Sequence, residues 1–220
     1  MERQAGTGYY IEPASGPGPG LLVLHSWWGL TNWFREVANG LADDGYSVLV
    51  PDLLGGALPQ TSAEAEVVLL DADMDRMAAL VHSSVHALRS HSRDPHDPVG
   101  ALGFAMGASW SMWLSARLGE SIRTVVGFYG TQNIDFDASV ADYQLHYGDA
   151  DEVVTDDEVA ETLAFLALSE RPVEVFRYAN ARHCFMEPHA GTFDEPASNL
   201  AWDRAKEFLG ARLLSRPRAE

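Results

Sequence analysis

The stretch VGALGFAMGA, residues 99–108, joins a short apolar run to a turn flanked by glycines. The apolar residues before the turn are typical of a buried β-strand, and residues 106–118 after it favour a helix. Ala105 stands at the centre of the turn, with Gly103 and Gly107 two residues to either side. A sharp strand-to-helix turn requires small residues there, because its central residue adopts a strained backbone conformation. The pattern predicts a nucleophile elbow whose central residue should be Ser, Cys or Asp, whereas alanine can attack nothing.

Strands and helices alternate along the rest of the chain. Short apolar runs predict buried strands at 21–26, 46–52, 98–104, 123–130, 143–148 and 172–178. Helical patterns occupy 32–45, part of 62–91, 106–118, 155–169 and 196–214. This alternation predicts an α/β fold with a mostly parallel central sheet and helices on both faces. We expect a single domain over 1–220, with 1–19 and 215–220 as peripheral termini.

Composition narrows the range of partners. The chain has 15 Lys and Arg against 32 Asp and Glu, a formal charge of −17, which opposes binding to nucleic acid and to anionic membranes. The one cysteine, Cys184, cannot form an intramolecular disulfide. The N-terminal MERQAGTGYY lacks the apolar core of a signal peptide, and no apolar stretch approaches the roughly 20 residues of a membrane-spanning helix. We therefore expect a cytoplasmic protein with no nucleic-acid or membrane partner.

Reactive side chains follow other predicted strands, at the ends where sites form in open α/β sheets. His25 and Ser26 follow the first strand, Asp149 and Asp151 follow 143–148, and His183 follows the last strand. The chain order of nucleophile position, acid and histidine is that of α/β-hydrolases. The spacing Gly-x-x-Asp-x-x-Val favours Asp151 over Asp149 as the acid.

These residues suit acyl transfer. His183 would act as general base, and Asp151 would fix its tautomer and balance the imidazolium. The N–H of Met106, at the start of a helix, would be one donor of an oxyanion hole, and the N–H of Trp27 the other. Ser26, Trp28, His25 and Tyr129 are candidates for the substrate pocket, although His25 could equally have a structural role.

Other assignments are weaker. Ser109 as the nucleophile would place two glycines in the middle of a strand. Cys184 directly follows the proposed base, which points its side chain elsewhere, and it reads as a small buried residue. His82 and His86 have the spacing of metal ligands on one helix face, yet no third ligand of known placement accompanies them. We therefore expect neither a metal nor an organic cofactor.

Four segments together resemble the dienelactone hydrolase family of α/β-hydrolases: VLHSWWGLTNWFREVANGLADDGYSVLVPDL, GFAMGA, GDADEVV and YANARHCF. The resemblance covers about residues 20–210. It implies hydrolysis of a small-molecule ester or lactone by a Ser or Cys nucleophile, with Asp and His completing the triad. Carried over by position, the nucleophile falls on Ala105, the acid on Asp151 and the base on His183.

The chain departs from that family at two further positions. Family members that open dienelactones usually have Glu where this chain has Ser26, and that Glu gates a thiol nucleophile. Ser26 therefore favours Ser over Cys as the original residue at position 105. The archetypal members also have Arg four residues after the His to hold the substrate carboxylate. Glu187 stands there instead and would repel a carboxylate, which argues against dienelactone as the substrate.

Ala105 leaves two interpretations open. It is either an engineered replacement of Ser or Cys, in a chain that is largely inactive for that reason, or a natural residue in a pseudo-hydrolase. The retained Asp151 and His183 favour the first interpretation. The second predicts a protein that binds a small ligand or acts as an interaction module. A monomer or a homodimer is compatible with either.

Overall fold

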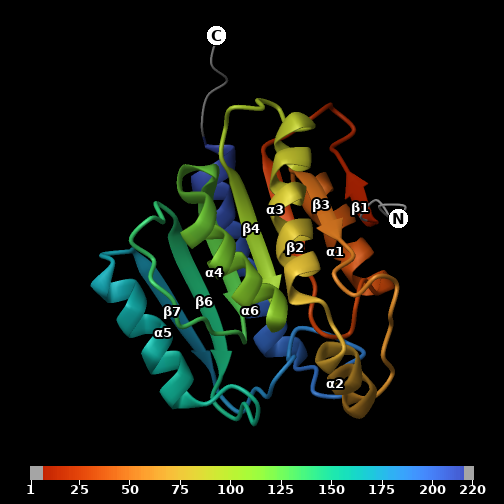
Figure 1. Ribbon diagram of the computed structural model, residues 1–220, viewed down its shortest axis with the longest axis vertical. Coiled ribbons are helices and arrows are strands. Elements are labelled where there is room, and N and C mark those ends of the chain that lie inside the picture. Colours follow the sequence, from red (N-terminus) through yellow and green to blue (C-terminus); the bar gives the residue numbers. More distant parts are fainter. Residues whose placement is uncertain (1–6, 216–220) are drawn as a thin grey trace.

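The computed structural model describes residues 7–215 and forms one seven-stranded sheet in the order β1-β3-β2-β4-β5-β6-β7 (Figure 1). β1 runs antiparallel to its neighbour β3, and every other neighbouring pair is parallel. The predicted α/β architecture with a mostly parallel sheet is thus confirmed. The strands are β1 (Gly8–Ile11), β2 (Gly20–Leu24), β3 (Ser47–Pro51), β4 (Val99–Phe104), β5 (Ile122–Phe128), β6 (Asp142–Gly148) and β7 (Val173–Tyr178).

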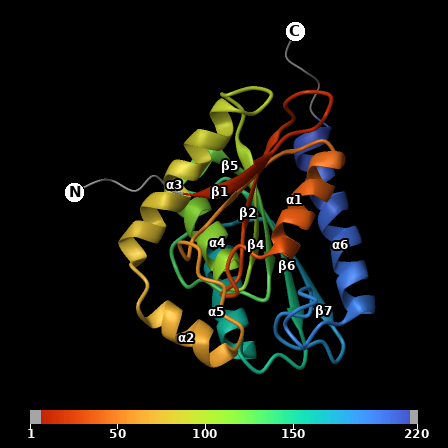
Figure 2. The ribbon, with the colours of Figure 1, turned by 90° about the vertical axis from the view of Figure 1, so that its right-hand side faces the viewer.

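Helices cover both faces of the sheet. The main helices are α1 (Asn32–Asp43), α2 (Ser62–Leu70), α3 (Met74–Ser90), α4 (Met106–Leu118), α5 (Asp156–Leu168) and α6 (Glu195–Leu209). A 3-10 turn, η1 (Gly119–Ser121), follows α4, and a π-helical segment, η2 (Gly210–Leu214), extends α6. Figure 2 shows α1 and α6 on one face and α3, α4 and α5 on the other. α2 lies beyond the carboxyl ends of the strands (Figure 1).

Burial on both faces explains why β2 and β4 carry no polar side chain. In β2, Leu21 and Val23 pack into the core beneath α1 and α6. Leu22 and Leu24 point the other way and pack against α3 and α4. Successive side chains of a strand alternate between faces, so a strand covered on both sides has no polar positions.

Two local features differ from the prediction. β1 lies within the segment expected to be a peripheral terminus, where Tyr9 pairs with Val50 and Ile11 with Val48. A four-residue edge strand with alternating burial is too short to give a clear apolar pattern. Within the stretch 62–91, the helical periodicity lies in residues 74–90, and the structure confirms it as α3. The difference is α2, a separate helix that ends before Asp73, which caps α3 by accepting a hydrogen bond from the N–H of Arg76. The predicted C-terminal tail, 215–220, lies almost entirely outside the described residues.

The strand order positions a site at one edge of the sheet. The chain moves from β2 outward to β3 and then returns to β4 on the other side of β2, which creates a topological switch point. At the carboxyl ends, Leu24 pairs with Gly103, and Phe128 pairs with both Phe104 and His146. The loops that follow β2, β4, β5 and β6 therefore leave the sheet side by side.

Candidate active site

The turn after β4 has the backbone of a nucleophile elbow. Ala105 adopts φ 48° and ψ −116°, a conformation that residues other than glycine rarely adopt. Its N–H donates a hydrogen bond of 2.9 Å to the carbonyl of Phe128, which extends the β4–β5 ladder into the turn. A Cβ at Gly103 would lie 2.2 Å from the carbonyl oxygen of Gly107, and one at Gly107 would lie 2.1 Å from that of Leu24. Both glycines are therefore required by close backbone contacts.

Two backbone N–H groups are available as oxyanion donors. Met106 begins α4, so its N–H points out of the positive end of the helix dipole. Trp27 lies in the loop after β2, which a hydrogen bond from the N–H of Gly29 to the carbonyl of Ser26 closes at 3.2 Å. Neither the Met106 nor the Trp27 N–H donates a hydrogen bond within residues 7–215. Both could donate to a substrate oxygen.

The side chains of Asp151 and His183, the candidate acid and base, are in hydrogen-bond contact. Nδ1 of His183 lies 2.9 Å from Oδ2 of Asp151 and 3.1 Å from Oδ1. Oδ1 of Asp151 also accepts hydrogen bonds from the N–H groups of Val153 and Val154. Burial opposes ionisation of Asp151, but the hydrogen bond from His183 and these two N–H groups outweigh it and lower the pKa of the carboxyl. Asp149, the rival candidate, instead accepts a hydrogen bond from the N–H of Asn180.

Tyr129 forms a wall beside the base. Its ring meets the ring of His183 edge-on, with the centroids 5.2 Å apart. It is fully buried at φ 41°, and burial raises the pKa of its hydroxyl well above the ordinary range. The hydroxyl donates a hydrogen bond of 2.9 Å to Oε1 of Glu187. Tyr129 therefore connects the base to a second buried carboxyl.

Glu187 is hydrogen-bonded to both Ser26 and Tyr129, which lie far from it in the sequence. Its Oε2 accepts a hydrogen bond of 2.7 Å from Oγ of Ser26, and its side chain is fully buried. Burial raises the pKa of Glu187 to about 7, although the hydrogen bonds from Ser26 and Tyr129 lower it. The sequence carries no signal for this pairing, since the two residues lie 161 positions apart.

The other pocket candidates have different surroundings. His25 is fully buried, with Nδ1 at 2.7 Å from the carbonyl of Ser26 and Nε2 accepting a hydrogen bond from the N–H of Leu53. Burial lowers the pKa of His25 to about 4, so the neutral ring braces the loop after β2. Trp28 packs edge-on against the rings of Trp27 and His189.

A cavity of about 450 Å³ adjoins Trp28. Its wall comes from the loop after β2, the start of α1, the β3–α2 loop and the loop before α6. Trp28, Trp33 and Pro188 supply apolar surface, and His189 lies beside them. Trp28 also directly follows Trp27, whose N–H is a candidate oxyanion donor.

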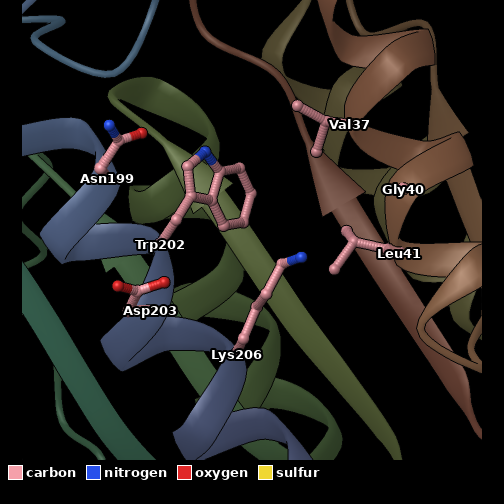
Figure 3. Close-up of a pocket in the computed structure, with 7 residues that line it drawn as sticks. All are labelled: Val37, Gly40, Leu41, Asn199, Trp202, Asp203 and Lys206. Atoms are coloured by element: carbon pink, nitrogen blue, oxygen red, sulfur yellow. The ribbon is translucent and has the colours of Figure 1, made fainter. Parts of the chain in front are cut away.

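A second cavity, of about 480 Å³, lies between α1 and α6 on one face of the sheet (Figure 3). It includes none of the residues assigned to the candidate active site. Its lining is Val37, Gly40, Leu41, Asn199, Trp202, Asp203 and Lys206.

The residues with weaker assignments have other surroundings. Ser109 lies inside α4, where its hydroxyl donates to the carbonyl of Thr131 at 2.6 Å. Cys184 is buried, and burial raises the pKa of its thiol well above the ordinary range. His82 and His86 contact each other, and residues 7–215 contain no cluster of three or more His, Cys, Asp or Glu side chains suited to a metal ion. None of the helices in that range is long and apolar enough to cross a membrane.

The model of the dienelactone hydrolase family matches residues 7–213 of this chain. The chain belongs to the dienelactone hydrolase family. It is 28% identical to Protein usf of Aquifex pyrophilus over 212 residues, which covers 92% of this chain and 91% of that one. It is 25% identical to a carboxymethylenebutenolidase of Rhodococcus opacus over 223 residues, covering 91% and 84% of the two chains.

Solved structures share the fold of this family member. A dienelactone hydrolase-like promiscuous phosphotriesterase from metagenomic libraries superposes with a TM-score of 0.79 at 22% identity, covering 96% of this chain and all of that one. A thermophilic esterase of Thermogutta terrifontis superposes with a TM-score of 0.74 at 12% identity, covering 100% and 92%. At these identities the likeness concerns architecture.

Proposed function

We propose that this site hydrolyses small, non-polymeric esters or lactones through a nucleophile at position 105. The observation that carries the proposal is the 2.9 Å contact between His183 and Asp151. The turn at Ala105 supplies the strained elbow conformation that the reaction needs, and the N–H groups of Met106 and Trp27 are unused donors. The names of relatives agree, since one is a carboxymethylenebutenolidase and one structural neighbour is an esterase.

The proposed mechanism proceeds through an acyl-enzyme. A Ser or Cys at position 105 attacks the carbonyl carbon, and Nε2 of His183 accepts the proton of the nucleophile. Asp151 holds the Nδ1–H and stabilises the imidazolium. The N–H groups of Met106 and Trp27 hold the oxyanion, and His183 returns the proton to the leaving oxygen. Water then attacks the acyl-enzyme carbonyl while Nε2 of His183 accepts its proton. His183 returns that proton to the nucleophile as the carboxylic acid product leaves.

With alanine at position 105, we expect this chain to be largely inactive. A triad without its nucleophile retains about 10³–10⁴-fold catalysis over water, from the oxyanion hole and binding alone. Ser26 in place of a thiol-gating Glu favours Ser as the residue that Ala105 replaces. The alternative is a natural pseudo-hydrolase that binds a small ligand, which Ala105 itself favours. The codon for residue 105 in the source gene separates a replacement from a natural alanine.

The decisive experiment restores the nucleophile. We expect Ala105→Ser to raise kcat for short-chain aryl esters and simple lactones by at least about 10²-fold, with Ala105→Cys also active. Adding His183→Ala to Ala105→Ser should remove that gain, and adding Asp151→Asn should lower kcat by up to about 10⁴-fold. Ala116→Ser, which adds a hydroxyl elsewhere on α4, is the matched control and should gain nothing. If neither variant at position 105 gains activity that depends on His183, the proposal fails.

A further inference from the structure

Glu187 is a buried carboxyl without a strong positive partner. It accepts hydrogen bonds from Ser26, in the loop that carries the Trp27 N–H, and from Tyr129, whose ring contacts His183. Within residues 7–215 no Lys or Arg forms an ion pair with it, and the nearest cationic candidate is Nε2 of His189 at 3.6 Å. The carboxyl thus lies between the oxyanion loop and the base, in an environment that strengthens electrostatic interactions.

Few of its neighbours can compensate its charge near neutral pH. Tyr129 and Cys184 stay protonated, because burial raises both pKa values well above their ordinary ranges. Burial lowers the pKa of His189, which favours its neutral form. From the loop after β6, Asp151 faces this region and is paired with His183. Among these neighbours of Glu187, none is a Lys or Arg side chain.

Ser26 and Tyr129 can form hydrogen bonds with Glu187 in either of its protonation states, without a change in side-chain positions. The hydroxyls of Ser26 and Tyr129 can each donate or accept a hydrogen bond. They donate to an ionised Glu187, and one of them can accept from the protonated acid. A change of pH therefore changes the charge of the site and leaves its shape in place.

The neighbouring cavity offers no positive charge either. Among the described residues that line it there is no Lys or Arg, and its one carboxylate is that of the exposed Glu36. Its aromatic and proline surfaces suit an apolar ring. A ligand carboxylate bound here would lose hydration without gaining a counter-ion.

We propose that Glu187 is a specificity-determining residue, which restricts the site to uncharged esters and lactones and excludes substrates that carry a carboxylate. The inference rests on the proposed function, because it assigns the substrate class of the same site. An ionised Glu187 repels a second anion across a poorly solvated region. Carboxymethylenebutenolide, the compound in the name of several relatives, bears such a carboxylate. We expect this chain to reject it.

Binding to the unmodified chain provides the test, because Ala105 leaves the probe intact. The matched probes are carboxymethylenebutenolide and its primary carboxamide, which differ in charge and hardly in size. By calorimetry at pH 8.5, the carboxamide should bind at least about tenfold more tightly than the carboxylate. Glu187→Gln should reduce this preference to less than about threefold. Glu120→Gln, which neutralises an exposed carboxylate on η1 outside this cavity, should leave the preference unchanged.

A pH series supplies a measurement that needs no change at Glu187. The preference for the carboxamide should decrease between pH 8.5 and pH 5.5 as Glu187 takes up a proton. The series is repeated with His183→Gln, which removes the imidazole, and the pH dependence should persist. Equal binding of the two probes at pH 8.5, or a preference that Glu187→Gln does not reduce, would overturn the proposal.

Failure of this proposal is distinguishable from failure of the proposed function. If Ala105→Ser hydrolyses the carboxylate and the carboxamide with equal kcat/KM, the site is a hydrolase without charge selection. If the unmodified chain prefers the carboxamide while Ala105→Ser hydrolyses no ester or lactone, charge selection stands and the catalytic proposal fails.

Discussion

The candidate site has two halves, which differ in what they retain of a hydrolase active site. The elbow at Ala105 keeps its backbone conformation and lacks a reactive atom. The half built from Asp151, His183 and Glu187 keeps its reactive atoms and their hydrogen bonds. The first half is fixed by close backbone packing, and the second is fixed by polar side chains.

This difference explains how the elbow persists without a nucleophile. Its conformation depends on the glycines at 103 and 107 and on the hydrogen bond from the N–H of Ala105 to Phe128, none of which involves the side chain at 105. The polar half has no such independence, because each carboxyl there depends on particular partners. Substitutions should therefore affect the elbow through sterics and the polar half through charge.

The largest effect is expected where the elbow is most tightly packed. In Gly107→Ala the added Cβ would lie 2.1 Å from the carbonyl oxygen of Leu24 and 2.7 Å from that of His25. Both contacts are with backbone, which cannot move without disturbing β2. We expect the free energy of unfolding to fall by at least about 3 kcal/mol, measured by urea denaturation.

Gly40→Ala is the matched control, in the interior of α1. A Cβ at Gly40 meets nothing within 4 Å, because the residue borders the open cavity of Figure 3. Alanine should stabilise the protein by about 0.5–1 kcal/mol, since glycine is unfavourable in a helix interior. If both substitutions changed stability equally, close packing would not be what fixes the elbow.

In the polar half, Glu187 should make stability depend on pH. Burial raises its pKa from 4.5 to about 7, so between these values the folded protein binds more protons than the unfolded chain. The resulting stabilisation is complete below pH 4.5 and is lost as pH rises through about 7. The loss amounts to up to about 3 kcal/mol. Glu187→Gln, which cannot ionise, should lack it.

The measurement is the difference in unfolding free energy between the unmodified chain and Glu187→Gln from pH 4.5 to 8. Burial lowers the pKa of His25 to about 4 and that of His146 to about 3, and these two groups make stability rise with pH in the acidic part of the range. Their contribution is common to both proteins and cancels. A difference that stays constant with pH would mean that Glu187 does not titrate in the folded state.

The elements that follow a strong local pattern could be predicted from the sequence. β2 and β4 are apolar on both faces, and α4 begins directly after the glycine-flanked turn, so residues 106–118 were predicted at their observed bounds. β1 could not be predicted, because an edge strand of four residues is held by its pairing with β3 rather than by its own composition.

The candidate site likewise contains some residues that could be predicted from the sequence and others that could not. Their positions after predicted strands, the chain order and the Gly-x-x-Asp-x-x-Val spacing point to Asp151 and His183, because parallel strands bring their carboxyl ends to one edge. The contacts of Glu187 with Ser26 and Tyr129 depend on how three distant loops pack, and no local pattern encodes that. The sequence marks Glu187 as a departure from the family pattern and gives no indication that the residue is buried.

The smallest effect concerns the strain that remains at the elbow. In Ala105→Gly the backbone would keep φ 48° without a Cβ, which relieves part of the roughly 1–3 kcal/mol that such a conformation costs. Glycine also makes the unfolded chain more flexible, which opposes the gain by about 0.4–1 kcal/mol. We expect a net increase of about 1 kcal/mol in the free energy of unfolding.

Ala116→Gly, also in α4, should do the opposite. Ala116 lies within α4 in regular helical conformation, where replacing alanine by glycine lowers the free energy of unfolding by about 1 kcal/mol. Opposite signs for the same chemical change would locate the strain at position 105. If both substitutions destabilise the protein equally, the turn at Ala105 stores no strain, and the packing of Gly103 and Gly107 does not force its backbone.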